Sequence, residues 1–216
     1  MALVTNYSTL QDHIADTLNR ADLTGVIPNF IQQFESRAKL GIEVSPGEII
    51  PLRQLTDRGT IQISADGLAL PTDFGLLESW YHDGATYFGP IGIVTPNQIG
   101  KLKAAYGDTG VPQFAAIVDG LVRFAPEPDT TYSTQLTYWR KVVSLSATQT
   151  TNWLLTQAPD IYLYGALVEA APYLKDDDRV ALWESQLRSR VRAFDAAQTD
   201  AMIGGAIQRT YTPFGG

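Results

Sequence analysis

The chain of 216 residues contains no cysteine and only two histidines. Without cysteine there can be no disulfide, thiolate zinc site, iron–sulfur cluster or thiol nucleophile. His13 falls near the polar side of a predicted helix and His82 beside a predicted turn, so we interpret both as surface residues rather than as catalytic bases or metal ligands. The absence of cysteine also fits synthesis in a reducing cytoplasm.

Basic charge and long apolar runs are scarce as well. Lysine and arginine number 16 against 23 acidic residues, which gives a net charge of −7. A non-specific nucleic-acid binder needs basic surface to neutralise phosphates, so this class is disfavoured. No apolar run approaches the roughly 20 residues that span a bilayer, and no secretory signal is visible. With 44% hydrophobic residues, the composition is that of an ordinary globular protein.

Motifs that would indicate chemistry are missing too. The glycine-containing segments do not match a phosphate-binding loop, and no serine lies in a nucleophile-elbow context. The Asp176–Asp178 run lacks the spacing of a calcium loop and is typical of a helix start. Two acidic pairs, Asp73 with Glu78 and Glu127 with Asp129, fall at turn positions where carboxylates are ordinary. We therefore expect no metal, no cofactor and no enzymatic activity, with a hydrolase using an unrecognised carboxylate site as an open alternative.

Two helices are predicted near the N-terminus. Residues 8–20 begin with Ser8 and Gln11 in the spacing of a capping box. Residues 24–40 have Pro28 in the first turns, and Gly41 can end this helix. In both segments apolar residues recur at spacings of three and four, which indicates one buried stripe per helix. The stripe residues are Leu10, Ile14, Leu18, Ile27, Phe30, Ile31, Phe34 and Ala38.

A second helical pair is predicted after residue 152. Asn152 suits the N-cap of a short helical turn, and Pro159 suits the first turn of the next helix. Small residues along that helix favour close packing, within the chain or between copies; they are Gly165, Ala166, Ala170 and Ala171. We expect four aromatic residues to take part in helix packing or in an interface, namely Trp153, Tyr164, Tyr173 and Trp183.

Between the helical pairs the sequence has the texture of an antiparallel sheet. Short alternating runs are separated by Asp66-Gly67, Asp83-Gly84 and Asp119-Gly120, which we interpret as hairpin turns. One short helix is predicted at 96–106. The predicted fold class is α+β: a four-helix bundle formed by the N- and C-terminal helix pairs, with an inserted antiparallel β domain and an extended C-terminal arm. The predicted segments are 1–44, 45–146, 147–203 and 204–216.

The last segment, 204–216, has two interpretations. One is a frayed tail, and the other is a flexible arm that becomes ordered on a partner. Glycines at both ends favour flexibility, whereas apolar residues within it would be unnecessary in a solvated tail. The candidate anchors for a partner are Ile207, Arg209, Tyr211, Pro213 and Phe214.

The predicted strands also carry many aromatic residues. On strands these most often pack in a core or interface. They could instead form a sugar-stacking platform, so a carbohydrate- or surface-binding β domain on a helical stem is the alternative function. The residues concerned are Trp80, Tyr81, Tyr87, Phe88, Tyr138 and Trp139.

Residues 152–187 read NWLLTQAPDIYLYGALVEAAPYLKDDDRVALWESQL. This stretch resembles the C-terminal signature of phage head-to-tail adaptor (connector) proteins of short-tailed phages. Three further segments agree with that family in order along the chain. They are IPNFIQQFESRAKLGI at 27–42, ISADGLALPTDFGLLESWYHDG at 63–84, and VPQFAAIVDGLVRFAPEPDTTYSTQLTYWRK at 111–141.

The resemblance implies a structural virion protein at the head–tail junction. In such a family, a ring of twelve neighbouring adaptor subunits attaches to the portal protein and contacts the tail nozzle or other tail components below. DNA passes through the lumen without specific binding. The signature is not a catalytic motif, so the resemblance assigns no catalytic residue.

Overall fold

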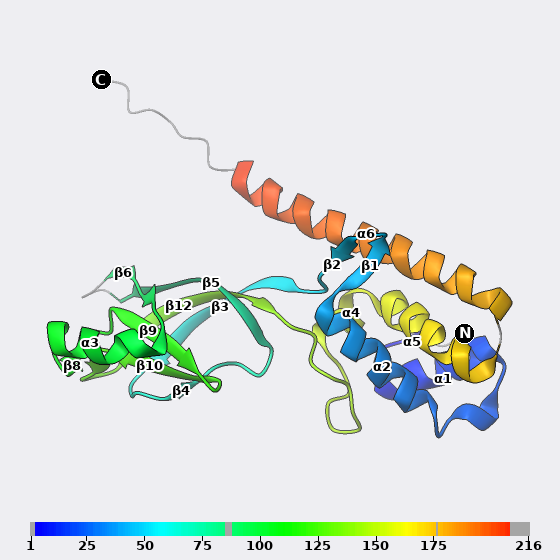
Figure 1. The fold of residues 1–216 in the computed structure, drawn as a ribbon, viewed down its shortest axis with the longest axis horizontal. Coiled ribbons are helices and arrows are strands. Elements are labelled where there is room, and N and C mark those ends of the chain that lie inside the picture. Colours follow the sequence, from blue (N-terminus) through cyan, green and yellow to red (C-terminus); the bar gives the residue numbers. More distant parts are fainter. Residues whose placement is uncertain (1–2, 85–87, 176, 208–216) are drawn as a thin grey trace. The chain divides into compact units, whose positions relative to one another are not determined.

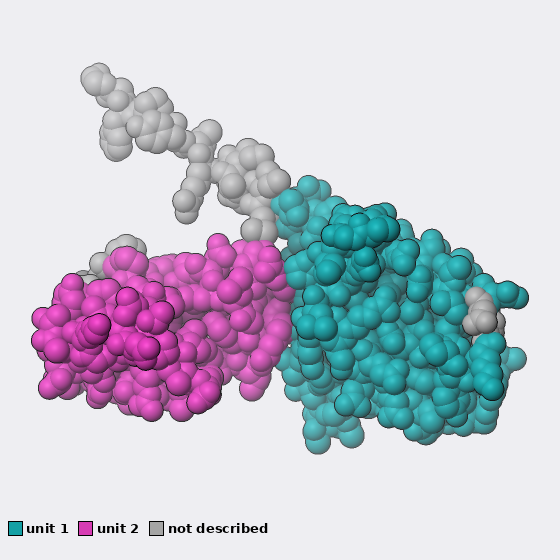
Figure 2. Space-filling model, viewed as in Figure 1, with its two compact units in different colours: residues 1–52, 142–216 teal, residues 53–141 magenta. Residues whose placement is uncertain are grey.

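The computed structural model describes residues 3–84, 88–175 and 177–207. They form two compact units, shown in different colours in Figure 2. Residues 1–52 and 142–216 make up the helical unit, and residues 53–141 make up the β unit. The chain is therefore an α+β protein, in which the segments before and after the β unit fold together (Figure 1).

The helical unit contains five α-helices, one 3₁₀ turn and one small hairpin among the described residues. Its elements are α1 (Tyr7–Leu18), the 3₁₀ turn η1 (Ala21–Leu23), α2 (Ile27–Leu40), β1 (Ile42–Ser45), β2 (Glu48–Ile50), α4 (Trp153–Gln157), α5 (Pro159–Leu174) and α6 (Asp177–Ile207). The sequence placed the first boundary at 44/45, inside the β1–β2 hairpin. The structure places it at 52/53, because Ile42 pairs with Ile50 and both are buried in the helical core.

Helix α1 begins one residue earlier than predicted and has a different cap. The side chain of Asn6 accepts a hydrogen bond from the Thr9 N–H at 3.0 Å, and Thr9 Oγ1 accepts one from the Asn6 N–H at 3.0 Å. The capping box predicted at Ser8 and Gln11 is therefore wrong. Asparagine is as strong an N-cap as serine, and the buried stripe is compatible with either start, so the stripe alone does not fix the first turn.

Helix α2 starts at Ile27, because residues 21–23 form the separate turn η1. Pro28 lies in its first turn, where the missing N–H costs nothing. The helix ends at Gly41 as predicted. The backbone φ of this glycine is +102°, a value that residues with a Cβ rarely adopt.

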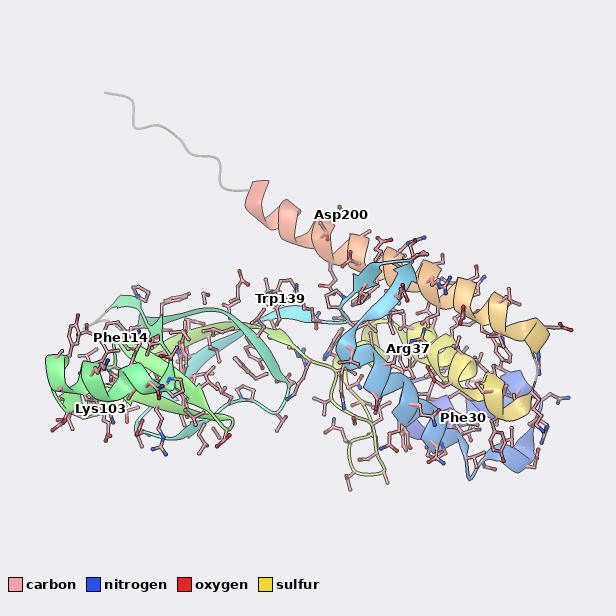
Figure 3. The ribbon with its side chains drawn as sticks, viewed as in Figure 1. Phe30, Arg37, Lys103, Phe114, Trp139 and Asp200 are labelled. Carbon is pink, nitrogen blue, oxygen red and sulfur yellow. The ribbon has the colours of Figure 1, made fainter. Side chains whose placement is uncertain are left out.

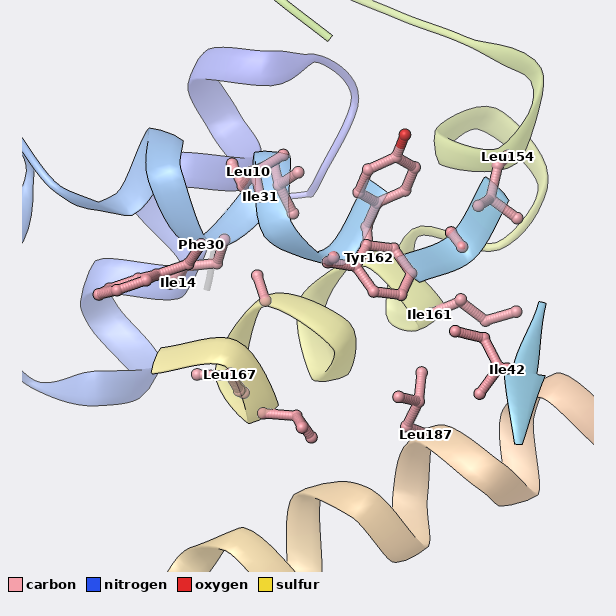
Figure 4. Close-up of a cluster of buried hydrophobic side chains, with 14 of the residues drawn as sticks. Leu10, Ile14, Phe30, Ile31, Ile42, Leu154, Ile161, Tyr162, Leu167 and Leu187 are labelled. Atoms are coloured by element: carbon pink, nitrogen blue, oxygen red, sulfur yellow. The ribbon is translucent and has the colours of Figure 1, made fainter. Parts of the chain in front are cut away.

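Helix α5 is the centre of the helical unit. It is contacted by α1, α2, α4 and α6, and Figure 4 shows its side chains between α2 and α6. A helix with neighbours on several sides must be apolar around most of its surface. Its buried residues accordingly include Ile161, Tyr162, Gly165, Ala166, Leu167, Val168, Ala170 and Ala171.

Helix α6 packs on this core with one face. Trp183, Leu187 and Val191 are buried, and the ring of Phe194 stacks on that of Trp153 at 6.1 Å between centroids. Past Phe194 the helix continues to Ile207 and extends beyond the core of the helical unit (Figure 1). Gly204 and Gly205 therefore lie within α6 rather than at its end.

The β unit contains two four-stranded sheets. Its elements are β3 (Gln54–Ile63), β4 (Leu68–Ala69), β5 (Phe74–Asp83), β6 (Phe88–Pro90), β7 (Gly92–Ile93), α3 (Pro96–Tyr106), β8 (Thr109–Gly110), β9 (Phe114–Val118), β10 (Leu121–Ala125), β11 (Glu127–Pro128) and β12 (Tyr132–Arg140). The antiparallel order β3-β12-β5-β6 forms one sheet and β4-β10-β9-β7 the other, with β7 parallel to β9. Helix α3 matches the predicted 96–106 and packs on β9 and β10.

The core of the β unit is built around β12, the central strand of the first sheet. Thr134, Leu136 and Tyr138 alternate inward along it. The Trp80 Nε1–H donates to Thr134 Oγ1 at 3.0 Å, and Thr134 donates to the Ile61 carbonyl at 2.8 Å. The inward-facing Thr134 therefore has hydrogen-bond partners on both neighbouring strands, β5 and β3.

The predicted turns have different outcomes. Asp119 and Gly120 have φ values of +51° and +77° and join β9 to β10, so this hairpin is confirmed. Asp66-Gly67 is not a hairpin, because β3 pairs with β12 whereas β4 pairs with β10. At Asp83-Gly84, strands β5 and β6 do pair, with Asp83 opposite Phe88, and residues 85–87 between them lie outside the described residues.

The prediction that His82 lies on the surface is wrong. The side chain is 1% exposed, and its Nε2 lies 2.6 Å from the Pro112 carbonyl oxygen. Along a strand, alternate residues share a face. Trp80 faces the core of the β unit, so His82, two residues later on β5, faces inward as well.

Close packing of α2 against α5 depends on Gly165. A Cβ at this position would lie 2.2 Å from Cδ2 of Phe34, inside van der Waals contact. We predict that Gly165→Ala destabilises the helical unit by roughly 1–3 kcal/mol, because α2 or the Phe34 ring must move. Denaturant unfolding followed by circular dichroism measures this loss.

Gly100→Ala is the matched control. Gly100 lies on α3, and a Cβ there meets nothing within 4 Å. Removing the backbone freedom of a helical glycine should stabilise the β unit by about 0.5–1 kcal/mol. Equal stability of Gly165→Ala and the wild-type protein would contradict the close-packing interpretation.

Candidate interaction surfaces

The four aromatic residues predicted for helix packing or an interface lie in different environments. Trp153 and Trp183 are buried, and Tyr164 is half-buried against the helical core. Tyr173 is 57% exposed, although its ring contacts Phe30 edge to face with 5.6 Å between centroids. Of the four, Tyr173 is thus the residue with the most surface for contact with another molecule.

The predicted arm lies mostly outside the described residues. Ile207 is the last residue of α6. The remaining candidate anchors, Arg209, Tyr211, Pro213 and Phe214, lie outside the described residues. Since Gly204 and Gly205 belong to α6, any arm would begin at residue 208 rather than at 204.

The first acidic pair has structural partners. Asp73 accepts hydrogen bonds from the Arg140 guanidinium at 2.8 Å and from the Tyr138 hydroxyl at 2.6 Å. Glu78 accepts one from the Trp139 indole N–H at 2.9 Å. These carboxylates hold the end of β12 to β5 and to the residue that precedes β5, so their positions are explained without a substrate.

The second acidic pair is also engaged. Glu127 forms a salt bridge with Lys103 of α3, and Asp129 accepts a hydrogen bond from the Tyr132 hydroxyl. Lys103, labelled in Figure 3, also lies 3.8 Å from Asp66, which in turn accepts from the Phe124 N–H. This charge network attaches α3 to the sheet beneath it.

Several of the aromatic residues considered for sugar stacking are not accessible. Trp80 is 3% exposed and Tyr138 is fully buried in the core of the β unit. Arg53 lies over the Trp139 ring, 4.6 Å from its centroid. Because a sugar platform needs free ring faces, Trp80 and Tyr138 cannot contribute to one.

A buried carboxylate joins the two sequence halves of the helical unit. Glu35 on α2 is 1% exposed. Its Oε1 accepts hydrogen bonds from the Leu145 N–H at 2.8 Å and from the Tyr162 hydroxyl of α5 at 3.1 Å. Glu35 therefore holds the segment that returns from the β unit against two helices.

Asn152 extends this network. Its Nδ2 donates to the Tyr162 hydroxyl at 2.5 Å and to the Val143 carbonyl at 2.7 Å. Its Oδ1 accepts from the Leu155 N–H at 2.8 Å, which confirms the predicted N-cap of the short helix α4. One side chain thus caps a helix and fixes the preceding loop.

Burial shifts the acid–base properties of this network. Loss of hydration raises the pKa of the Glu35 carboxyl, and the hydrogen bonds from Leu145 and Tyr162 oppose that shift only in part. Burial also raises the pKa of the Tyr162 hydroxyl, with the nearby Glu35 charge acting in the same direction.

Sequence reasoning missed Glu35. The only signal was its position inside an apolar stripe, four residues after Ile31 and three before Ala38, where a charged side chain is unexpected. Its partners lie more than a hundred residues later in the chain, so the sequence alone could not identify them.

Two other kinds of site are absent from the part of the chain that the structure describes. Within residues 3–84, 88–175 and 177–207, no group of three or more histidine or acidic side chains is arranged to hold a metal ion. In the same part of the chain, no helix has the length and apolar character needed to cross a membrane.

The two acidic pairs and Asn152 thus take part in hydrogen bonds, ion pairs and helix capping. A family model for the SU10 adaptor protein matches residues 5–210, which span both units. The chain therefore belongs to the SU10 adaptor protein family, a family of phage head-to-tail adaptors, and is a structural component of the phage virion. A search of curated proteins finds no match to it.

The buried carboxylate gives the helical unit a pH-dependent stability. Because the pKa of Glu35 is raised in the folded protein, the unfolded chain loses this proton at lower pH than the folded one. Stability should therefore fall as pH rises from the ordinary glutamate value near 4.5 through the raised folded pKa. We predict that Glu35→Gln abolishes this decrease, as measured by unfolding at a series of pH values.

The comparison with Glu35→Ala separates charge from hydrogen bonding. Alanine leaves the Leu145 N–H and the Tyr162 hydroxyl without their acceptor, which should cost roughly 1–3 kcal/mol. Glutamine can still accept both bonds and should retain stability near neutral pH. A decrease of the same size in the wild-type protein and in Glu35→Gln would assign the pH dependence to other groups.

Proposed function

We propose that this protein is the subunit of an adaptor ring that joins the portal to the tail and lines the DNA exit channel. The observation that carries the proposal is the family match over residues 5–210, which includes both compact units. The protein would be made in the host bacterial cytoplasm and incorporated at the head–tail junction. Its partners would be the portal protein, the neighbouring copies and the tail component below.

The helical unit suits the wall of such a ring. A closed ring needs heterologous contacts, in which one surface of a subunit meets a different surface of the next. Helices α1, α2, α5 and α6 would act together as one bundle, with α5 buried at its centre. In a ring of twelve, the β unit would supply a second surface for the tail component.

Net charge supports passage of DNA rather than binding. Each copy carries a formal charge of −7. Twelve copies around a channel create a strongly negative field, which repels phosphates and prevents DNA from adhering to the wall. Specific DNA recognition plays no part in this proposal.

The segment after α6 is proposed as the portal contact. Thr212 precedes Pro213, which favours an extended backbone that can add to a sheet edge or lie in a groove. Tyr211 and Phe214 provide apolar anchors, and Arg209 can pair with an acidic surface. An arm that becomes ordered only on docking would limit premature assembly.

Removal of residues 208–216 tests this contact. We predict that the truncated protein keeps the melting temperature of the full chain, because α6 ends at Ile207, but binds portal rings of the same phage at least about tenfold more weakly. Electron microscopy of portal rings mixed with adaptor, together with sedimentation, gives the occupancy. Tyr211→Ala with Phe214→Ala should reproduce most of the loss without shortening the chain.

Wild-type occupancy with the truncated protein would exclude the C-terminal segment as the anchor and assign portal binding to the helical unit. Failure of the full-length chain to bind portal rings would contradict the proposed function itself.

A further inference from the structure

Between β12 and α4, residues 142–152 form neither helix nor strand, yet this segment is fixed to the helical unit. Its Leu145 side chain is buried in the helical core. The Leu145 N–H donates to the Glu35 carboxylate at 2.8 Å, and the Thr150 carbonyl accepts from the Tyr7 N–H of α1 at 2.7 Å. Figure 1 shows the segment as a loop that projects from the helical unit on the side away from α6.

The tip of this segment, residues 146–151, is held in one shape by its own polar groups. Ser146 Oγ accepts from the N–H groups of Thr148 at 3.3 Å and Gln149 at 2.9 Å, and the Ser146 N–H donates to the Gln149 carbonyl at 2.9 Å. The Gln149 amide donates to the Thr151 carbonyl at 2.5 Å. A loop that is already ordered loses little conformational entropy when it binds a partner, and loops positioned by a rigid scaffold often carry binding functions.

The attachment of this loop depends on a buried charge. Glu35 is 1% exposed, and a carboxylate loses its hydration when it is buried. Lys39 adds an exposed bond to Ser144 Oγ at 2.9 Å. An apolar side chain in place of Glu35 would avoid the loss of hydration, but it could not hold the Leu145 N–H. Stability of the core alone does not require the carboxylate, which indicates that the position of the loop matters.

The 146–151 loop offers only neutral hydrogen-bonding groups, and residues 147–151 are all exposed. From residue 142 to 159 the sequence contains no aspartate, glutamate, lysine or arginine. The hydroxyls of Thr150 and Thr151 have no hydrogen-bond partner among the residues that the structure describes, and a hydroxyl can both donate and accept. A DNA-binding loop needs cations to neutralise phosphates, so this loop is suited to a protein partner.

The charge of the whole chain favours a second copy as that partner. Each copy has a formal charge of −7, and like charges that meet across an interface cost free energy. Two copies therefore approach most favourably where the surface is uncharged, and the 146–151 loop is such a surface. The portal contact proposed above follows the C-terminal end of α6, whereas the loop projects from the other side of the helical unit.

We propose that the 146–151 loop of one copy contacts an uncharged surface of the next copy in the ring. The hydroxyls of Thr150 and Thr151 hydrogen-bond to polar groups of the neighbour, and Glu35 is a positioning residue for the loop. A ring requires the loop to meet a different surface of the next copy, not the same loop. The inference rests on the proposed function.

A photo-crosslinking amino acid, benzoylphenylalanine, placed at Thr150 of the full-length chain tests the contact. The position is exposed, and its carbonyl can still accept from Tyr7, so the fold should be retained. On portal rings of the same phage, we expect irradiation to join adaptor to adaptor. The yield should be several-fold above that from the same substitution at Thr130, an exposed position in the β unit. Mass spectrometry should place the other end of the crosslink outside residues 142–152.

A charge added to the loop provides an independent arm. Thr150→Asp introduces a negative charge, whereas Thr150→Asn has nearly the same shape and is neutral. Both variants should keep the wild-type melting temperature, because the Thr150 hydroxyl has no partner among the described residues. Contacts between neighbours make the filling of portal rings cooperative. Thr150→Asp should therefore make the occupancy curve more gradual and raise the half-filling concentration several-fold, whereas Thr150→Asn and Thr130→Asp should retain the wild-type curve.

Crosslinks mainly to the portal protein, crosslinks from loop to loop, or a yield at the Thr130 level would overturn the proposal. Identical occupancy curves for Thr150→Asp and Thr150→Asn would do the same. Weaker binding of Thr150→Asp at sparse occupancy would assign the loop to the portal instead.

Failure of the wild-type chain to bind portal rings contradicts the proposed function, and the loop is then decided in solution. Irradiation of the Thr150 variant at high concentration supports the contact if adaptor–adaptor crosslinks exceed the Thr130 yield, and contradicts it if they do not.

Discussion

The contact between α2 and α5 is the constraint on which the helical unit depends. Gly165 lets the Phe34 ring lie against the α5 backbone, and the next residue of α2, Glu35, accepts a hydrogen bond from Tyr162 on α5. These helices come from opposite sides of the β unit in the sequence. Their packing is reinforced by a 2.9 Å salt bridge between Glu169 and Arg37, which Figure 3 labels. It joins the parts of the helical unit that precede and follow the β unit in the sequence.

The remaining helices pack around the contact between α2 and α5. With α5 enclosed, α6 has only one face to pack on the core, and the rest of its length remains available at the surface. The family assignment gives that architecture its biological context, since phage head-to-tail adaptors are structural parts of the virion.

Local patterns predicted the elements that depend on neighbouring residues. The helix at 96–106, the Asn152 cap, the Pro159 start and the Asp119-Gly120 hairpin are all set within a few positions. Features that depend on distant partners were not predictable in this way. The buried side chains of Glu35 and His82 have their hydrogen-bond partners at Leu145 and Pro112, which lie far along the chain. The pairing of β4 with β10 rather than with β3 depends on how the sheets assemble. The residues proposed to bind the portal stay a prediction, because all of them except Ile207 lie outside the described residues.

The most direct test of the central claim is a reconstruction of the virion neck by electron cryomicroscopy at a resolution that distinguishes side chains. The account predicts a ring of twelve copies between portal and tail, with the helical unit of each copy, recognisable by the α2–α5 contact, contributing to a continuous wall. A neck in which this chain is absent, or in which isolated copies decorate the tail without forming a closed ring, would contradict it.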